Sequence, residues 1–212
     1  MNPRVSILMT TWNRAGFIGK AIQSVIDQSF AAWELIIIDD GSTDNVADVV
    51  KKWQIKEKRI KFIPLSHIGR IAIVSNAGLR EALGEYIAIL DDDDWWLDPK
   101  KLEKQVEFLD KNPDYVGCGG GFIVVDGDGD KKAKILKPQR DESIRKVALF
   151  ANPIANSSTL FRRSAVEKLG PYDESMLQFA DWDFWLKMGT YGKLYNLTEY
   201  FFAYRMWEGG MS

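Results

Sequence analysis

Short apolar runs alternate with amphipathic stretches through the first ninety residues of the chain. Four runs of β-forming residues predict buried strands at 5–10, 33–38, 60–65 and 86–90. Between them, apolar side chains recur every three or four residues and predict helices across 17–26, 46–53 and 71–83, the last with Ile71, Ser75, Leu79 and Leu83 on one face. This order predicts a parallel sheet with right-handed crossovers and helices on both faces.

After residue 90 the pattern becomes less regular. A helix is expected to begin near Pro99 and to stop at Asn112-Pro113. Beyond it the chain predicts a strand through Val125, further strands at 157–161 and 200–206, and helices at 144–150, 164–169 (ended by Gly170) and 181–188. No repeat or linker divides the sequence, so a single globular domain over 1–212 is expected.

The acidic turn at 126–130 superficially resembles a calcium-binding loop. However, Lys131 stands where the sharp-turn glycine belongs, and Lys137 stands where the bidentate glutamate belongs. The turn is therefore predicted to connect two strands of a hairpin.

Four consecutive aspartates at 91–94 follow a predicted buried strand and precede Trp95 and Trp96. The strand at 33–38 also ends in aspartates, at 39–40. Ligands of open α/β sheets bind at the carboxyl ends of the strands. Adjacent carboxylates repel one another unless a positive group joins them, and oxygen ligands suit Mg²⁺ or Mn²⁺. A solvated acidic loop is the alternative, but the apolar frame favours a divalent cation site.

Composition and charge limit the classes of molecule that this protein is expected to bind. Lys and Arg number 28 against 30 Asp and Glu, and no basic run occurs, so nucleic acid is not expected. The sequence has neither the apolar core of a signal peptide nor a membrane-spanning stretch, which predicts a cytoplasmic protein and leaves peripheral contact at the inner face of the membrane open. The single cysteine, Cys118, and the single histidine, His67, offer neither an internal disulfide nor a zinc site, and both are expected to be structural.

Several phosphate-binding and catalytic motifs are absent from the sequence. Neither GxGxxG nor GxxxxGK[ST] follows a predicted strand, so the backbone amides of these motifs cannot cradle phosphates. GxSxG and HExxH are also missing. If phosphates bind at the acidic strand ends, a cation held by the aspartates is the expected partner.

Five segments carry a resemblance to a known family: VSILMTTWNR, ELIIIDDGSTDN, SNAGL, GEYIAILDDDDWW and DWDFWLKM. In this order and at these separations they resemble glycosyltransferases of family 2. The resemblance extends from Val5 to the C-terminal strand. It implies the GT-A fold, a Rossmann-like, mainly parallel α/β sheet flanked by helices, with a smaller acceptor-side C-terminal part.

The resemblance also implies a reaction and a role for each half of the chain. A sugar would pass with inversion from a nucleotide-sugar donor, UDP-sugar favoured, to a hydroxyl of a polysaccharide, glycolipid or glycoprotein acceptor, with Mn²⁺ or Mg²⁺ as cofactor. Residues 1–98 would bind the nucleotide-sugar, and residues 99–212 would form the acceptor side.

Individual residues match the motifs of the family. Asp181 matches the general base, and Asp93 matches the ligand of a metal that bridges the diphosphate. Asp40 would accept a hydrogen bond from the base, and Asp92 would face the ribose. The other residues assigned to the nucleotide-sugar are Thr10, Trp12, Asn13, Arg70 and Asp91. Three positions depart from the family pattern: Ser75, Ala180 and Trp207 replace an arginine, a glutamate and a nearby histidine.

The chemistry of glycosyl transfer asks for the same groups. Negative charge grows on the departing diphosphate, which a divalent cation stabilises, and the acceptor hydroxyl must lose a proton to a base. Asp181 and Asp183 both qualify by residue type, and position favours Asp181. Alternatively, Asp181 only caps its helix.

Two other functions and one assembly remain open at this point. A sugar-nucleotide nucleotidyltransferase shares the architecture and the acid-metal chemistry, but it needs a glycine-rich loop with an arginine after the first strand. A non-catalytic nucleotide-sugar-binding module would need a partner for its acceptor site. A homodimer would form if the aromatic strand at 200–204 were an edge that pairs between subunits.

Overall fold

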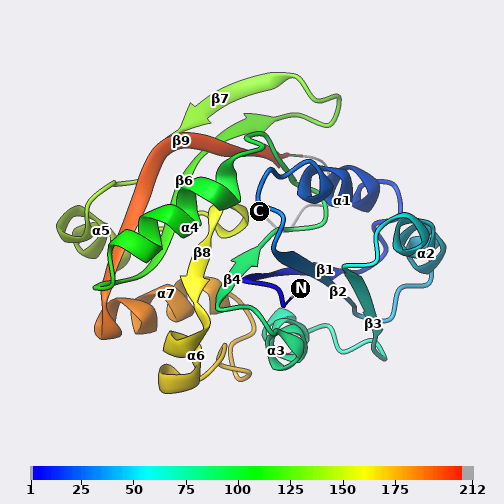
Figure 1. Ribbon diagram of the computed structural model, residues 1–212, viewed down its shortest axis with the longest axis horizontal. Coiled ribbons are helices and arrows are strands. Elements are labelled where there is room, and N and C mark those ends of the chain that lie inside the picture. Colours follow the sequence, from blue (N-terminus) through cyan, green and yellow to red (C-terminus); the bar gives the residue numbers. More distant parts are fainter. Residues whose placement is uncertain (1, 207–212) are drawn as a thin grey trace.

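A computed structural model describes residues 2–206 and folds them around one curled, mixed sheet (Figure 1). The first half contains β1 (Val5–Thr11), α1 (Ile18–Ile26), β2 (Trp33–Asp39), α2 (Val46–Lys56), β3 (Ile60–Pro64), α3 (Ile71–Glu81) and β4 (Tyr86–Ile89). The second half contains β5 (Trp95–Trp96), α4 (Lys101–Lys111), β6 (Tyr115–Val125), β7 (Lys131–Ile135), α5 (Asp141–Ala148), the 3₁₀ turn η1 (Asn156–Ser158), β8 (Leu160–Arg162), α6 (Arg163–Leu169), α7 (Ala180–Tyr191) and β9 (Lys193–Arg205). The predicted α/β fold class is confirmed.

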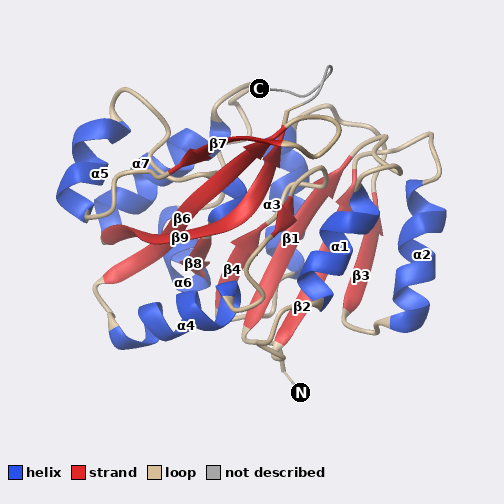
Figure 2. Ribbon diagram, turned by 90° about the horizontal axis from the view of Figure 1, so that it is seen from above, coloured by secondary structure: helices blue, strands red, loops and turns tan. Residues whose placement is uncertain are grey.

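The described strands follow the order β3-β2-β1-β4-β8-β6-β9-β5, with β7 paired to β6. The pairs among β3, β2, β1 and β4 are parallel, as predicted. Beyond β4 the sheet is mixed, because β8 runs antiparallel to both β4 and β6. The long strands β6 and β9 run parallel and side by side (Figure 2). The parallel prediction therefore holds for the first half, and the C-terminal half extends the sheet with mixed pairings.

Alternate residues of the strands face opposite sides of the sheet. In β1, Ile7 and Met9 pack with α1, α2 and α4, whereas Leu8 packs with α3, α5, α6 and α7. This alternation follows from the two-residue period of a strand. Helices cover both faces, as predicted. None of the helices within residues 2–206 is long and apolar enough to cross a membrane.

The predicted face of α3 is correct at Leu79, which packs against the core, but wrong at both of its ends. The helix ends at Glu81, Leu83 lies beyond it with 63% of its surface exposed, and Ile71 is also exposed. Gly78 lies on the buried face, where a Cβ atom would come within 2.6 Å of the Ile38 side chain. Because small side chains let the helix approach the sheet closely, its contact face has no row of large apolar residues to recognise in the sequence.

Two strand predictions in the second half are also corrected. The segment at 157–161 is not one strand, since η1 occupies its start and β8 begins only at Leu160. The segment at 200–204 is not an edge, because it lies inside β9, between β6 and β5. The two tryptophans of β5 cover the side of β9 that was predicted to be open.

The hairpin prediction is confirmed. The N–H of Asp126 donates to the carbonyl of Asp130 at 3.1 Å, Gly129 has a φ of 93°, and β6 and β7 pair antiparallel on either side. Gly170 ends α6 with a φ of 87°, also as predicted. The helix expected at 144–150 begins earlier, at Asp141, and stops at Ala148, which leaves Phe150 exposed outside it.

Candidate active site

The carboxyl ends of β1, β2 and β4 lie next to one another at one edge of the sheet. Thr10, half-buried, pairs with Ile38, and the N–H of Asp40 donates to the carbonyl of Thr11 at 2.9 Å. The N–H of Leu90 likewise donates to the carbonyl of Leu8 at 3.1 Å. The acidic loop, residues 91–94, therefore starts beside the loops that follow β1 and β2, and the two predicted groups of aspartates share one edge.

Asp40 holds the loop that follows β3. Its carboxylate accepts hydrogen bonds from the backbone N–H groups of Ile68 at 2.7 Å and Gly69 at 2.9 Å, and the His67 ring lies 3.1 Å away. Trp12 stacks on His67 with ring centroids 4.7 Å apart and is 49% exposed. The pair forms an accessible aromatic face at the predicted donor pocket. The sequence predicts a structural role for His67, and no motif around it points to the stacking with Trp12.

Asn13 ties the loop after β1 to the loop after β2. It has a φ of 54°, and its side-chain oxygen accepts hydrogen bonds from the N–H groups of Thr43 at 2.8 Å and Asp44 at 3.3 Å. Its own N–H donates to Ser42 Oγ at 2.8 Å. Asn13 therefore shapes the edge, and its contact with a donor stays a prediction.

Arg70 and Asn76 connect α3 to the loop that precedes α7. Arg70 Nη1 donates to the carbonyl of Glu174 at 3.3 Å. The buried Asn76 side chain donates to the carbonyl of Tyr172 at 2.9 Å and accepts from its N–H at 3.0 Å. The SNAGL segment, found in the sequence only by resemblance, therefore fixes the chain that leads to Asp181.

Protein groups hold Asp91 and Asp94 at the two ends of the acidic loop. Asp91 accepts hydrogen bonds from Asn156 Nδ2 at 2.9 Å and from Ser157 Oγ at 3.1 Å. Asp94 lies 2.6 Å from Ser157 Oγ and accepts from the N–H of Arg205 at 3.1 Å. The outer two carboxylates of the loop are therefore directed toward η1 and the end of β9.

Burial makes the ionised forms of these carboxyl groups unfavourable. Asp92 is buried, and its Oδ2 forms no hydrogen bond. Burial raises the pKa of Asp92 to about 7, although the nearby Thr11 hydroxyl counters part of the rise. Burial and the charge of Asp93 raise the pKa of Asp91 to about 6, and burial raises the pKa of Asp94 well above its usual value. A cation at the loop would offset these costs.

The residues of the acidic loop fit a metal site in which phosphate groups of the substrate supply the remaining ligands. Among residues 2–206, no group of three or more His, Cys, Asp or Glu side chains is arranged to hold a metal ion. Asp91 and Asp94 already have protein partners, whereas Asp92 has a buried oxygen without one. Mg²⁺ is commonly bound by one or two carboxylates together with substrate phosphates. The oxygen-only donor set and the unpaired oxygen of Asp92 agree with such a site.

Asp181 lies on the first turn of α7, on the same side of the molecule as the acidic loop. Asn152 Nδ2 donates to its carboxylate at 2.6 Å, and the charge of Asp181 contributes to the raised pKa of Asp91. Asp183, the other candidate base, instead pairs with Lys187 of its own helix at 2.8 Å. The residue before the helix, Phe179, has a φ of 59°.

The predicted helix cap at Asp181 has no support in these contacts. No side chain caps the start of α7, and Asp181 bonds to Asn152 instead.

Of the three departures from the family pattern, Ala180 is buried at the start of α7 and Ser75 is half-buried in α3. Trp207 lies outside the described residues.

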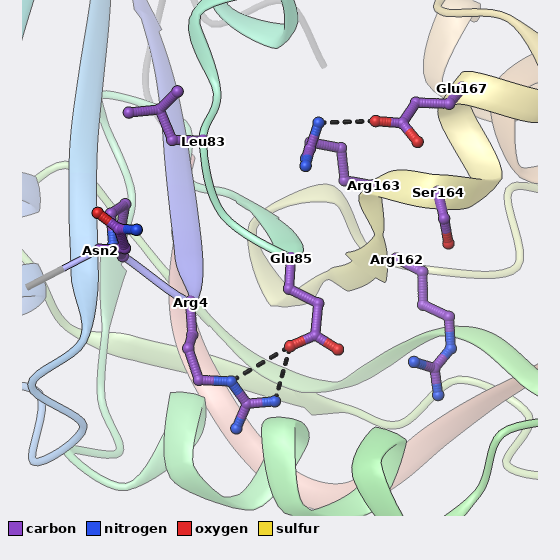
Figure 3. A pocket seen from close by; sticks show the side chains of 9 residues that line it. Asn2, Arg4, Leu83, Glu85, Arg162, Arg163, Ser164 and Glu167 are labelled. Carbon is purple, nitrogen blue, oxygen red and sulfur yellow. Dashed lines mark hydrogen bonds and ion pairs between the residues drawn. The ribbon is translucent and has the colours of Figure 1, made fainter.

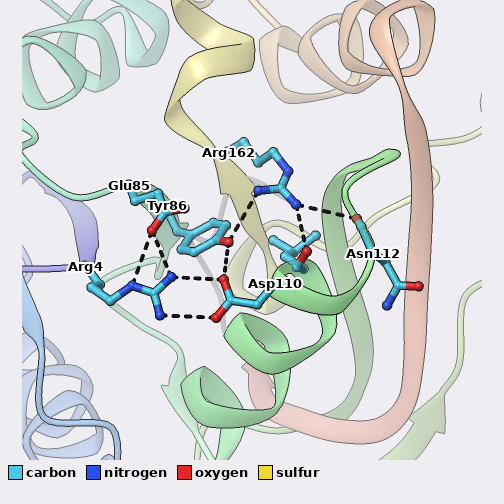
Figure 4. Close-up of polar contacts among 7 residues, drawn as sticks. Arg4, Glu85, Tyr86, Asp110, Asn112 and Arg162 are labelled. Carbon is cyan, nitrogen blue, oxygen red and sulfur yellow. Dashed lines mark hydrogen bonds and ion pairs between the residues drawn. The ribbon is translucent and has the colours of Figure 1, made fainter.

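A cavity of about 400 Å³ lies at the other end of the sheet, where β1 and β4 begin (Figure 3). Its charged side chains already have protein partners. Arg4 pairs with Glu85 at 2.8 Å and with Asp110 at 2.9 Å, and Arg162 donates to the Tyr86 hydroxyl at 3.3 Å (Figure 4). This network joins β1, β4, α4 and β8, so we interpret it as structural and not as the active site.

The fold is that of an α/β protein whose acidic residues gather at the carboxyl ends of its parallel strands, where ligands of open α/β sheets bind. The family model described as glycosyl transferase family 2 matches residues 6–170. The chain belongs to this family, as its sequence motifs predicted.

Relatives and solved structures agree with this assignment. The chain is 34% identical to the putative glycosyltransferase EpsE of Bacillus subtilis over 96% of its own length and 73% of that protein. It is 31% identical to the uncharacterized glycosyltransferase MJ1057 of Methanocaldococcus jannaschii, over 94% of the chain and 69% of that protein.

Two solved structures share the fold. S. aureus TarS 1-349 in complex with UDP-GlcNAc has a TM-score of 0.78 at 19% identity, over 99% of this chain and 60% of that one. The mannosyltransferase PcManGT of Pyrobaculum calidifontis, in complex with GDP-Man and Mn²⁺, has a TM-score of 0.77 at 18% identity, over 99% of this chain and 59% of that one. The chain thus spans about three fifths of these structures.

Proposed function

We propose that this chain is a metal-dependent, inverting glycosyltransferase that moves a sugar from a nucleotide-sugar to an acceptor hydroxyl. The observation that carries the proposal is the position of Asp181, whose charge reaches Asp91 of the acidic loop while Asn152 holds its carboxylate at 2.6 Å. A proton acceptor and a cluster of oxygen ligands on one side of a family 2 chain are what such a transfer requires.

The donor would lie across the carboxyl edge of the sheet, bound by the half at 1–98. The exposed face of Trp12, stacked on His67, suits a nucleobase, and Asp40 stabilises the loop that carries His67. Thr10, Asn13 and Arg70 line the same edge, and Asp92 would face the ribose beside Asp91. A UDP-sugar is the favoured donor, although one structural neighbour was solved with UDP-GlcNAc and another with GDP-Man.

Asp93 would be the principal protein ligand of Mn²⁺ or Mg²⁺ at the tip of the acidic loop. When bound, the cation would stabilise the negative charge that grows on the departing diphosphate. Asp92, with its unpaired buried oxygen, lies beside this position.

Asp181 would take the proton of the acceptor hydroxyl from the acceptor side, the half at 99–212. As the acceptor oxygen bonds to the anomeric carbon, the bond from that carbon to the phosphate oxygen breaks, and the nucleoside diphosphate leaves from the opposite face. The hydrogen bond from Asn152 orients the carboxylate of Asp181 for this transfer. The acceptor would belong to a polysaccharide, a glycolipid or a glycoprotein glycan, and we place the reaction in the cytoplasm, at the inner face of the membrane where the acceptor is lipid-linked.

Nucleotide binding tests the donor site directly. The unfolding midpoint is measured with UDP, GDP or dTDP, each with Mn²⁺ and with a chelator. A ligand at a hundred times its Kd stabilises a protein by about 2.7 kcal/mol. A shift for one nucleotide that needs the metal supports the proposal and names the donor class, whereas no shift with any nucleotide would overturn it.

Transfer itself is tested with the matching nucleotide-sugar. Slow metal-dependent hydrolysis by the chain alone separates an enzyme from a non-catalytic binding module, because water serves as the acceptor. Release of pyrophosphate from a nucleoside triphosphate and a sugar phosphate would instead favour a nucleotidyltransferase.

A further inference from the structure

The acidic loop is a tight turn whose two ends meet on one hydroxyl group. The N–H of Asp94 donates to the carbonyl of Asp91 at 3.1 Å, so these residues occupy the first and fourth positions of the turn. Ser157 Oγ lies 3.1 Å from the Asp91 carboxylate and 2.6 Å from the Asp94 carboxylate, and it accepts the N–H of Asp91 at 3.1 Å. Ser157 is only 1% exposed. Asp92 and Asp93 are left at the tip of the turn.

The turn η1, which carries Ser157, is itself held by buried side chains. Trp96 Nε1 donates to the carbonyl of Ser157 at 2.8 Å, and Gln105 Nε2 donates to the carbonyl of Ser158 at 2.8 Å. Lys101 Nζ donates to the carbonyl of Thr159 at 3.2 Å. Because Lys101 and Gln105 are fully buried in α4, the hydroxyl of Ser157 is presented from a rigid base.

Like charges at the two ends of a short turn would spread the loop apart. A hydroxyl between them supplies a donor to either carboxylate and keeps both ends of the turn on η1. The middle of the turn then carries Asp92, whose buried Oδ2 has no hydrogen-bond partner and can bind a ligand. Without this contact, the four carboxylates would compete for a cation in several arrangements.

We infer that Ser157 is a positioning residue that directs Asp91 and Asp94 into the protein and thereby sets Asp92 and Asp93 toward the metal and diphosphate of the donor. The inference rests on the proposed function. Asn156 assists from the same turn through its hydrogen bond to Asp91 at 2.9 Å. Groups outside the ligand shell that orient the ligands of a metal affect metal affinity by about 10- to 100-fold when they are removed.

The neighbouring serine provides a matched control. Ser158 is as buried as Ser157, but its hydroxyl donates to the carbonyl of Ala155 at 2.7 Å and accepts the N–H of Gly120 at 3.1 Å. Ser157→Ala and Ser158→Ala therefore each remove one buried hydroxyl from the same turn. Only the first removes a contact to the acidic loop.

The experiment measures nucleotide affinity by calorimetry, with UDP and GDP, across a Mn²⁺ titration and in chelator. Ser157→Ala is expected to weaken the metal-dependent affinity and to raise the half-saturating Mn²⁺ concentration at least about tenfold. Ser158→Ala is expected to change both by less than about threefold, and neither variant alters the residual affinity in chelator. Equal effects of the two substitutions would overturn the inference.

If Ser157→Ala does not fold, Asn156→Ala tests the inference in its place. Asn156 is only half-buried, so this substitution is expected to disturb folding less. It should raise the half-saturating Mn²⁺ concentration in the same direction, and an unchanged value would overturn the inference. Wild-type protein that binds no nucleotide with metal would overturn the proposed function and this inference together. Wild-type binding with indistinguishable serine variants would overturn this inference alone.

Discussion

Two aspartates on the first turn of α7 have different partners. Asp181 bonds to Asn152 at 2.6 Å, whereas Asp183 pairs with Lys187 of its own helix at 2.8 Å. Residue type could not separate them in the sequence, because Asn152 is far away along the chain. The choice of Asp181 rests on its place in a motif, and it stays a prediction that the contacts do not test.

Asp181→Asn should lower the turnover number at least about a hundredfold while nucleotide affinity stays within about twofold, because the amide cannot accept the acceptor proton. Asp183→Asn is the control, since it alters a half-buried ion pair with Lys187 and leaves the Asp181–Asn152 contact in place. Steady-state kinetics and calorimetry on both variants check this. Equal turnover of the two variants would remove Asp181 from the mechanism.

Asp93→Ala should reduce nucleotide affinity measured with Mn²⁺ to the level that wild-type protein shows in chelator. The reason is that the proposed cation loses its principal protein ligand while the aromatic and backbone contacts of the donor remain. Titration calorimetry with and without chelator measures both states. Metal-dependent affinity that survives the substitution would place the metal elsewhere.

At the scale of elements, the strands of the first half were predictable because continuous apolar runs are typical of strands buried on both faces. The contact face of α3 and the turn η1 were not predictable. The first depends on Gly78, a residue with no apolar signal, and the second depends on buried partners in α4 and β5. The acidic loop was found from the sequence, but the inward direction of two of its members was not, since Asn156 and Ser157 lie more than sixty residues away.

Two helical glycines should respond in opposite directions to alanine. At Gly78 in α3, an added Cβ would lie 2.6 Å from Ile38 Cδ1 and 3.3 Å from Leu8 Cδ2, so overpacking should cost about 1–3 kcal/mol against a helix-propensity gain of about 1 kcal/mol. At Gly189 in α7 the nearest atom is 3.8 Å away, and Gly189→Ala should stabilise by up to about 1 kcal/mol. Urea denaturation measures both values. A Gly78→Ala variant as stable as Gly189→Ala would contradict the close packing of α3.

At the scale of the whole molecule, a lysine side chain lies inside the core. Lys101 is fully buried, donates to Gln105 Oε1 at 2.7 Å, and lies 4.2 Å from the centroid of the Trp96 ring. Burial lowers the pKa of Lys101 to about 7. The core that supports η1 therefore contains an amine whose charge depends on pH.

The stability of the protein should reflect this amine. Between about pH 7 and pH 10, the unfolded chain binds a proton at Lys101 that the folded chain lacks, so its contribution to the free energy of unfolding rises with pH by up to about 1.4 kcal/mol per unit. Lys101→Met removes the titration. Denaturation at pH 7, 8 and 9 should show the difference, wild type minus variant, increasing with pH. Other groups such as Cys118 titrate in both proteins, so their contribution cancels in this difference. A difference in the free energy of unfolding that stays constant with pH would contradict the lowered pKa of Lys101.

The last strand has a consequence for the order in which the protein is made. β9 pairs with both tryptophans of β5, and the N–H of Arg205, its final residue, bonds to Asp94. A ribosome delivers the chain from its N-terminus at about 5–20 residues per second, and folding can begin before synthesis ends. The four parallel strands can therefore assemble while β9 is still being translated, but Asp94 has to wait for Arg205 to emerge. In a nascent chain stalled short of Arg205, the four parallel strands and the acidic loop would be present, but Ser157 would hold Asp94 without the second hydrogen bond from the end of β9.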